Sequence, residues 1–240
     1  WDDHDYGLND GGVEFYKKIE SQQEFLDFLK VPADDGRRNR AGIYHSKTYQ
    51  TKQGSIKVII LDTRYFRTAL TEATEENKRY QPNVYGEGTV LGETQWKWFQ
   101  NELSNSTADF NVIVSSIQFL SYKHGYESWG TFPHEVDKMK NIIKASNAKG
   151  VLMLSGDRHI SEFSATKIEG LDFPLVDFTS SGLTHSYTGF KGEENPDRIG
   201  KVVSELSFGI LKFDFKSNKI TMQMRGKDNV LQQEHIQSYN

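Results

Sequence analysis

Two groups of polar side chains stand out because their types suit metal binding or acid–base catalysis. Near the start of the chain, carboxylates, an amide and an imidazole lie close together in sequence: Asp2, Asp3, His4, Asp5, Asn9 and Asp10. Carboxylates packed this closely are costly to ionise unless a cation neutralises them. The group is therefore either a solvated acidic turn or a metal-binding loop, and the adjacent Trp1 and Tyr6 favour an ordered loop. An EF-hand calcium loop is excluded because Gly7 occupies its third ligand position.

The second group, Gly156-Asp157-Arg158-His159, directly follows the apolar run 150–155. Loops that follow sheet strands are common ligand sites in α/β folds. Asp157 and His159 can present one oxygen and one nitrogen to a metal, although such a turn is also common without any ligand. Arg158 is either placed to contact phosphate or an ordinary exposed arginine of a loop.

The two groups together offer carboxylate, imidazole and amide ligands without thiolate, since the chain has no cysteine. This set suits hard or borderline ions such as calcium, iron, manganese or zinc. Two such ions bridged by a carboxylate would polarise phosphoryl oxygens and lower the pKa of a bound water. The ligand types therefore fit metal-assisted hydrolysis of a phosphate ester.

Hydrophobic periodicity predicts the elements that position these groups. Helices are expected from a capping box at Ser21 to about Val31, and over 93–103 and 133–145. Strands are expected over 42–49, 55–62, 110–117 and 150–156 and then, without intervening helices, near 160–168, 174–179, 207–215 and 219–225. Residues 71–89 form a polar surface excursion. This order predicts an α/β fold, a layered sandwich of mixed β-sheets, in a single domain spanning 1–240.

Composition narrows the function classes. The 240-residue chain has a net charge of −4, so it lacks the positive field that would by itself hold nucleic acid or an anionic membrane. The absence of cysteine removes disulfide scaffolds and thiol nucleophiles. No apolar run reaches the roughly eighteen residues of a transmembrane helix, and no signal peptide is visible.

Several short motifs, taken in order along the chain, resemble the successive landmarks of one enzyme family. They are Trp1-Asp2-Asp3-His4-Asp5, Asn9, Leu61-Asp62-Thr63-Arg64, Leu91-Gly92 with Gln95 and Trp98, Ser115-Ser116-Ile117-Gln118, and Ser155-Gly156-Asp157-Arg158-His159. The chain resembles the alkaline phosphatase D family, a branch of the calcineurin-like metallophosphoesterases. The resemblance implies two mixed sheets flanked by helices, with a metal cluster at the loop ends. It also implies a phosphoric ester hydrolase acting on small-molecule or lipid phosphate esters.

The resemblance assigns metal ligands residue by residue. Asp3 matches the family's metal-bridging position, and Asn9 matches an asparagine that approaches the calcium side of the cluster. Asp157 and His159 match the ligands of the later motif. Gln118 stands where many members of the wider superfamily carry a metal-binding histidine. The implied cofactors are calcium with iron, with manganese or zinc as alternatives.

The resemblance also implies catalytic and substrate-binding roles. His4 matches the histidine that stabilises the transition state and protonates the leaving oxygen, and Arg158 is placed to contact phosphate. His185 is a candidate for supporting the site. Trp129 either lines the substrate cleft or belongs to the core. Arg64 could anchor a phosphate, but a structural pair with Asp62 is the better interpretation.

Two family features are not found in this sequence: a Gly-Asp-x-x-Tyr motif and an upstream cysteine ligand. The chain is accordingly expected to be a C-terminal fragment that lacks the family's N-terminal part. The resemblance also implies a periplasmic, cell-surface or secreted location. Two alternatives stay open, namely a phospholipase- or nuclease-type phosphodiesterase, and a catalytically inactive homologue that binds metal or glycan.

Overall fold

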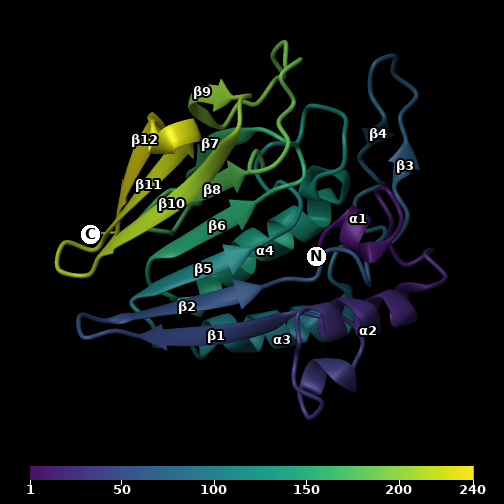
Figure 1. Cartoon of the computed structure of the whole chain (residues 1–240), viewed down its shortest axis with the longest axis horizontal. Coiled ribbons are helices and arrows are strands. Elements are labelled where there is room, and N and C mark those ends of the chain that lie inside the picture. The colour runs from purple at the N-terminus through teal and green to yellow at the C-terminus, as the bar shows by residue number, and fades with distance from the viewer. Residues whose placement is uncertain (240) are drawn as a thin grey trace.

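A computed structural model describes residues 1–239, and a seven-stranded mixed β-sheet dominates it (Figure 1). The strand order is β1-β2-β5-β6-β8-β7-β9. The strands of this sheet are β1 (His45–Gln50), β2 (Ser55–Ile60), β5 (Phe110–Val114), β6 (Val151–Ser155), β7 (Ser161–Thr166), β8 (Leu175–Ser180) and β9 (Arg198–Val203). Strands β2, β5, β6 and β8 run parallel, whereas β1, β7 and β9 are antiparallel to their neighbours.

The parallel strands bring their carboxyl ends to one edge of the sheet. Helix α3 (Gly92–Ser104) connects β2 to β5, and helix α4 (Pro133–Ser146) connects β5 to β6. Each connection must return the chain to the far end of the sheet before the next parallel strand begins. The loops that follow β2, β5, β6 and β8 therefore meet at the same edge, beside the N-terminal segment and its one-turn helix α1 (Asp3–Tyr6) (Figure 1).

Helices cover one face of this sheet. Trp96, Phe99 and Leu103 of α3 and Met139 and Ile143 of α4 are buried in one cluster with strand residues that point the same way. The spacing of these helix residues produces an apolar stripe on one side, which explains why the two segments form amphipathic helices. The strand partners in this cluster are Ile59, Ile113 and Met153.

A second, three-stranded sheet covers part of the opposite face. Its strands, in the order β10-β11-β12, are β10 (Ser207–Asp214), β11 (Lys219–Gly226) and β12 (Leu231–Ser238). Met222 and Met224 of β11 pack with Leu152 and Phe178 of the large sheet. Because side chains alternate across a strand, Leu152 faces this sheet while its neighbour Met153 faces the helices. The predicted α/β sandwich with a mixed sheet flanked by helices is confirmed, but its second sheet is antiparallel rather than mixed.

Most predicted elements are present, with shifted ends. The hairpin β1–β2 closes through a hydrogen bond from the Thr51 amide to the Gly54 carbonyl at 2.8 Å. Helix α2 (Lys18–Phe28) begins three residues before the predicted capping box at Ser21, and Lys17 precedes it without a side-chain cap. The polar excursion 71–89 contains a two-stranded ribbon of β3 (Thr71–Glu72) and β4 (Tyr80–Gln81).

Besides β3 and β4, strands β9 and β12 were not predicted from the sequence. Strand β9 is only partly covered and β12 is polar and half exposed, so they show neither apolar alternation nor a continuous apolar run. The apolar run 58–61 at the end of β2 is fully covered on one face only. Ile59 is buried against the helices, whereas Val58 and Ile60 on the other face are only partly covered.

Candidate active site

The loops at the carboxyl edge of the sheet and the N-terminal segment line a pocket of 670 Å³. The two polar groups identified in the sequence meet here, although Asp3 and Asp157 are 154 positions apart in the chain. Six predicted site residues line this pocket: Asp3, His4, Asn9, Asp157, Arg158 and His159. The order of the parallel strands produces this meeting, because β6 delivers the second group to the edge where α1 lies (Figure 1).

Three carboxylates in the pocket are arranged so that they could hold a metal ion. Asp2, Asp3 and Asp157 each offer an oxygen, and these oxygens lie within 4.8 Å of one another. Asp3 is held in place because its carboxylate accepts hydrogen bonds from the amides of His4 (2.7 Å) and Asp10 (3.1 Å). Burial raises the pKa of Asp157 well above its usual range, and the negative charges of Asp2 and Glu127 raise it further. A bound cation would favour the ionised form of these crowded carboxylates, and oxygen ligands suit a hard cation.

The turn after β6 adopts unusual backbone conformations. Asp157 and His159 have φ values of 69° and 51°, in the left-handed region that non-glycine residues seldom occupy. Neighbouring loops fix the turn, since the Gly156 amide donates to the Ser116 carbonyl (2.9 Å) and the His159 amide donates to the Ser181 hydroxyl (3.1 Å). Such conformations cost roughly 1–3 kcal/mol each and cluster at functional sites. In this turn the two residues with left-handed backbone conformations, Asp157 and His159, both line the acidic pocket.

A buried ion-pair network supports Asp2. Arg64 is fully buried, and its guanidinium pairs with Asp2 and, at 2.5 Å, with the buried carboxylate of Glu127. Arg67 lies on the other side of Glu127, with 2.9 Å between its Nε and Oε1 of Glu127. Burial opposes the charge on Arg64, but Glu127 and Asp2 together raise its pKa above the ordinary value. Arg64 is therefore a permanent cation beneath the N-terminal segment.

The predicted pairing of Asp62 with Arg64 involves the backbone rather than the guanidinium. The Asp62 carboxylate accepts the backbone N–H of Arg64 (3.0 Å), the N–H of Ile43 (2.9 Å) and the indole N–H of Trp1 (2.9 Å). Sequence reasoning missed Glu127 as the partner of Arg64. An isolated glutamate in an irregular segment carries no local signal of its burial.

The histidines of the site differ in exposure. The side chain of His4 is 80% exposed, so it is accessible from the pocket. The ring of His159 contacts the ring of His185 edge to face, with 4.8 Å between the ring centroids. Burial, followed by the neighbouring His185, lowers the pKa of His159, which favours the neutral form that ligates metals. His185 therefore contacts His159, which lines the pocket.

Two predicted site residues lie elsewhere. Gln118 is fully buried, and its amide group donates to Glu162 (2.8 Å) and Thr179 (2.9 Å) inside the fold. Trp129 is also fully buried, and its indole N–H donates to the Ser115 hydroxyl (2.9 Å). Neither is among the described residues that line the pocket, so of the two interpretations of Trp129 the structure favours the core. Its position in a single-turn helix (Trp129–Thr131) points the ring inward against the apolar cluster of α3 and α4.

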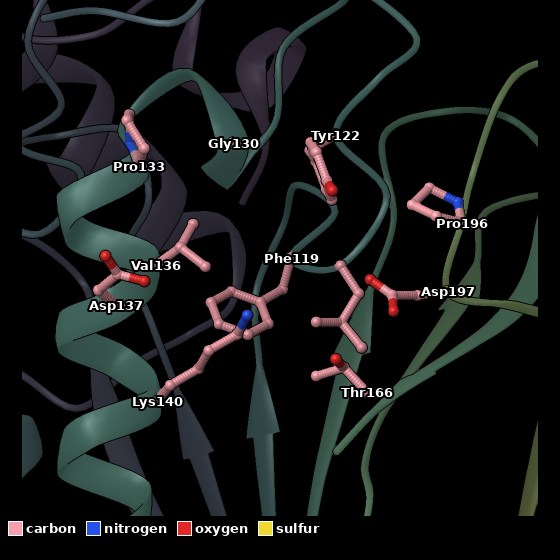
Figure 2. Close-up of a pocket in the computed structure, with 11 residues that line it drawn as sticks. Phe119, Tyr122, Gly130, Pro133, Val136, Asp137, Lys140, Thr166, Pro196 and Asp197 are labelled. Atoms are coloured by element: carbon pink, nitrogen blue, oxygen red, sulfur yellow. The ribbon is translucent and has the colours of Figure 1, made fainter. Parts of the chain in front are cut away.

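A second pocket of 410 Å³ lies beside α4, between this helix, the segment that follows β5 and the residues just before β9 (Figure 2). Figure 2 shows Val136 and Lys140 of α4 pointing toward Phe119, with Asp197 across the opening. Its base is apolar, and it holds no described group of three metal-ligating side chains, unlike the pocket with Asp3 and His4. The chemistry therefore belongs to the larger, acidic pocket.

The fold is a mixed α/β sandwich, and carboxylate and imidazole side chains gather in one pocket at its loop edge. The sequence model of the PhoD-like phosphatase family matches residues 13–224, so this chain belongs to that family. The matched range includes Asp157, Arg158 and His159, whereas the segment from Asp2 to Asp10 precedes it.

The relatives agree with this assignment. Alkaline phosphatase D of Bacillus subtilis (strain 168) is 29% identical over 140 residues, which cover 51% of this chain and 24% of that protein. A solved structure of PhoD superposes with a TM-score of 0.72 at 20% identity, covering 99% of this chain and 51% of the other. The chain thus spans about a quarter of the curated relative and about half of the solved one. The resemblance to the alkaline phosphatase D family is confirmed.

Proposed function

We propose that this protein hydrolyses phosphate esters in a metal-dependent reaction. One observation carries the proposal: a single pocket brings the carboxylates of Asp2, Asp3 and Asp157 together with two histidines and Arg158. Membership of a phosphatase family and the name of the relative, alkaline phosphatase D, support the same reaction class.

The metal would be held by Asp2, Asp3 and Asp157, with Asn9 and His159 as further ligands in the same pocket. We propose calcium with iron, or manganese or zinc in their place, because oxygen and imidazole ligands suit these ions. Such an ion supplies positive charge to phosphoryl oxygens and lowers the pKa of bound water. Gln118 is not proposed as a ligand, since it is not among the described residues that line this pocket and its amide nitrogen donates inside the fold.

In this proposal, Arg158 binds the phosphate ester and His4 donates a proton to the leaving group. Arg158 lines the pocket and offers its guanidinium to a phosphoryl oxygen. His4 is accessible from the pocket, and its imidazole can donate a proton to the departing alkoxide. His185 supports the ring of His159 by their edge-to-face contact. The proposed substrates are small-molecule or lipid phosphate esters.

We further propose a periplasmic, cell-surface or secreted location, since the relatives are alkaline phosphatases of this family. Within residues 1–239 no helix has the length and apolar character needed to cross a membrane. Fractionation of cells that express the full-length protein tests the location, and recovery in the cytosol alone would contradict it.

The reaction is tested with p-nitrophenyl phosphate and its bis ester, each measured with and without calcium, iron, manganese or zinc. We expect turnover that depends on added metal and is lost with a chelator. Preference for the bis ester would favour a phosphodiesterase. An intact preparation without turnover under any of these conditions would indicate an inactive metal- or glycan-binding homologue and contradict the proposal.

His4→Ala provides the residue-level test of the same proposal. Loss of a proton donor should lower kcat by about 10²- to 10⁴-fold, with little change in folding because the side chain is exposed. His134→Asn, in the first turn of α4 and outside the acidic pocket, is the control. An unchanged kcat in His4→Ala would remove His4 from the mechanism.

A further inference from the structure

Arg158 is held on two sides by residues that neither the sequence nor the family comparison singled out. Its guanidinium carbon lies 4.1 Å from the ring centroid of Tyr126, a cation–π contact. Its Nη2 donates to Oε1 of Glu193 at 2.7 Å. Both contacts are shielded, since the side chains of Arg158 and Glu193 are only 11% and 18% exposed. The orientation of the guanidinium is therefore restricted.

The guanidinium keeps free donor capacity in this position. An arginine has five N–H donors, and within the described residues the only hydrogen bond from the Arg158 side chain is the one to Glu193. Its Nε is buried without any hydrogen-bond partner among residues 1–239. The Nη1 group has no hydrogen bond within the described residues and is not among the buried unpartnered atoms, so it is the donor that an incoming oxygen acceptor can meet. Phosphoryl oxygens, which match the planar fork of arginine, are such acceptors.

Glu193 is not needed to attach its own loop to the fold. Two residues on, the side chain of Asn195 donates to the Ser164 hydroxyl (2.8 Å) and to Glu162 (3.2 Å). The other end of the loop is attached by the Tyr187 amide, which donates to the His159 carbonyl at 2.7 Å. The loop therefore has independent anchors on both sides of Glu193. The contact with Arg158 remains as the specific role of the Glu193 carboxylate.

We propose that Glu193 is a positioning residue for phosphate binding: it holds Arg158 across Tyr126 so that the guanidinium meets a phosphoryl group in the acidic pocket. The inference rests on the proposed function, because it requires a phosphate ester or phosphate ion in that pocket. Without Glu193 the long arginine side chain must be ordered by the ligand itself, which weakens binding.

The test measures the binding of inorganic phosphate to the full-length protein as purified, by titration calorimetry. Glu193→Ala should weaken phosphate binding about three- to tenfold, the loss expected when a ligand has to immobilise one flexible side chain. In the turnover assay, KM should rise by a similar factor while kcat changes little. Glu193→Gln keeps an acceptor for Nη2, so its affinity should stay within about twofold of the wild type.

A double-mutant cycle with Arg158→Ala separates positioning from general stabilisation. In the Arg158→Ala background, Glu193→Ala should have no further effect, because the side chain that it positions is absent. Glu194→Ala is the matched control. Glu194 is the next residue of the same loop, but it pairs with the exposed Lys123 outside the pocket.

The outcomes are distinguishable. Equal losses from Glu193→Ala in both backgrounds would overturn the inference, as would unchanged or tighter phosphate binding in the single variant. Tighter binding would mean that Glu193 competes with the anion for Arg158. A wild-type protein that neither binds phosphate nor turns over any ester would instead contradict the proposed function, and the inference with it.

Discussion

Arg64 and Glu127 show how buried charged side chains support the candidate site. Arg64 is sealed from solvent, yet its guanidinium reaches the Asp2 carboxylate at the pocket wall. Burial raises the pKa of Glu127, and the positive charges of Arg64 and Arg67 reduce this rise. Removing the cation would leave two carboxylates close together in a poorly solvated place.

We therefore expect Arg64→Ala to lower the free energy of unfolding by about 3–5 kcal/mol, the usual cost of breaking a buried pair by removing one partner. Urea denaturation measures this change. Lys97→Ala, which removes only a solvent-exposed pair with Glu93, should leave the urea midpoint unchanged. Equal midpoints for Arg64→Ala and the wild type would show that the network does not stabilise the fold.

At the scale of elements, β8 anchors the segment 119–130 that carries Tyr126 and Glu127 to the pocket. Asp177 of β8 is buried, and one of its oxygens accepts the backbone N–H groups of Phe119 (2.8 Å) and Leu120 (3.0 Å). Its other oxygen accepts the Ser155 hydroxyl at 2.7 Å. Burial nevertheless dominates and raises the pKa of Asp177 to about 6.

This pKa predicts a pH dependence of stability. Because the folded-state pKa of Asp177 lies above the ordinary value of 3.8, the folded state binds this proton more tightly than the unfolded state. The resulting stabilisation is complete below about pH 4 and is lost as the pH rises through about 6, a change of about 3 kcal/mol. Asp177→Asn keeps the planar shape and one oxygen that can accept the two backbone amides, and it cannot titrate; the Ser155 hydroxyl must turn to accept from its NH2 group.

Urea unfolding of the wild type and Asp177→Asn across pH 4 to 8 measures this effect. The difference between their unfolding free energies should shift in favour of Asp177→Asn as the pH rises, by about the same 3 kcal/mol. A difference that stays constant with pH would mean that Asp177 does not titrate in this range.

At the scale of the whole molecule, the sheet joins two segments that are far apart in the chain. Asp2 and Asp3 come from the first residues, and Asp157 comes from the loop after β6. A metal ion bound to all three would link these segments, and an ion that binds only the folded state stabilises it by mass action. Without the ion, the same carboxylates repel one another.

Metal removal should therefore lower Tm, and the effect should depend on Asp157. At a free metal concentration of a hundred times Kd, the gain is about 2.7 kcal/mol. Asp157→Asn should remove most of this gain while raising the stability of the metal-free protein. Thermal melts with added metal and with chelator measure both effects, and Asp214→Asn, at the exposed end of β10, is the control. A full metal-dependent gain in Asp157→Asn would exclude Asp157 as a ligand.

The sequence alone was sufficient for features that depend on local pattern. The apolar stripes of α3 and α4 and the buried runs of β5 and β6 predicted those elements, because period and residue type are properties of neighbouring positions. The same holds for the two polar groups, since Asp3 and Asp157 were recognisable from their type and from the motifs around them.

Only the tertiary structure decided which residues meet. It paired Arg64 with Glu127, turned Trp129 and Gln118 into the interior, and placed Glu193 against Arg158. These outcomes depend on the relative positions of segments that are distant in the chain, and on which face of a loop is covered. Local periodicity contains neither kind of information. Candidate ligands such as Asp3 and Asp157 could therefore be named from the sequence, whereas the charges and contacts around them could not.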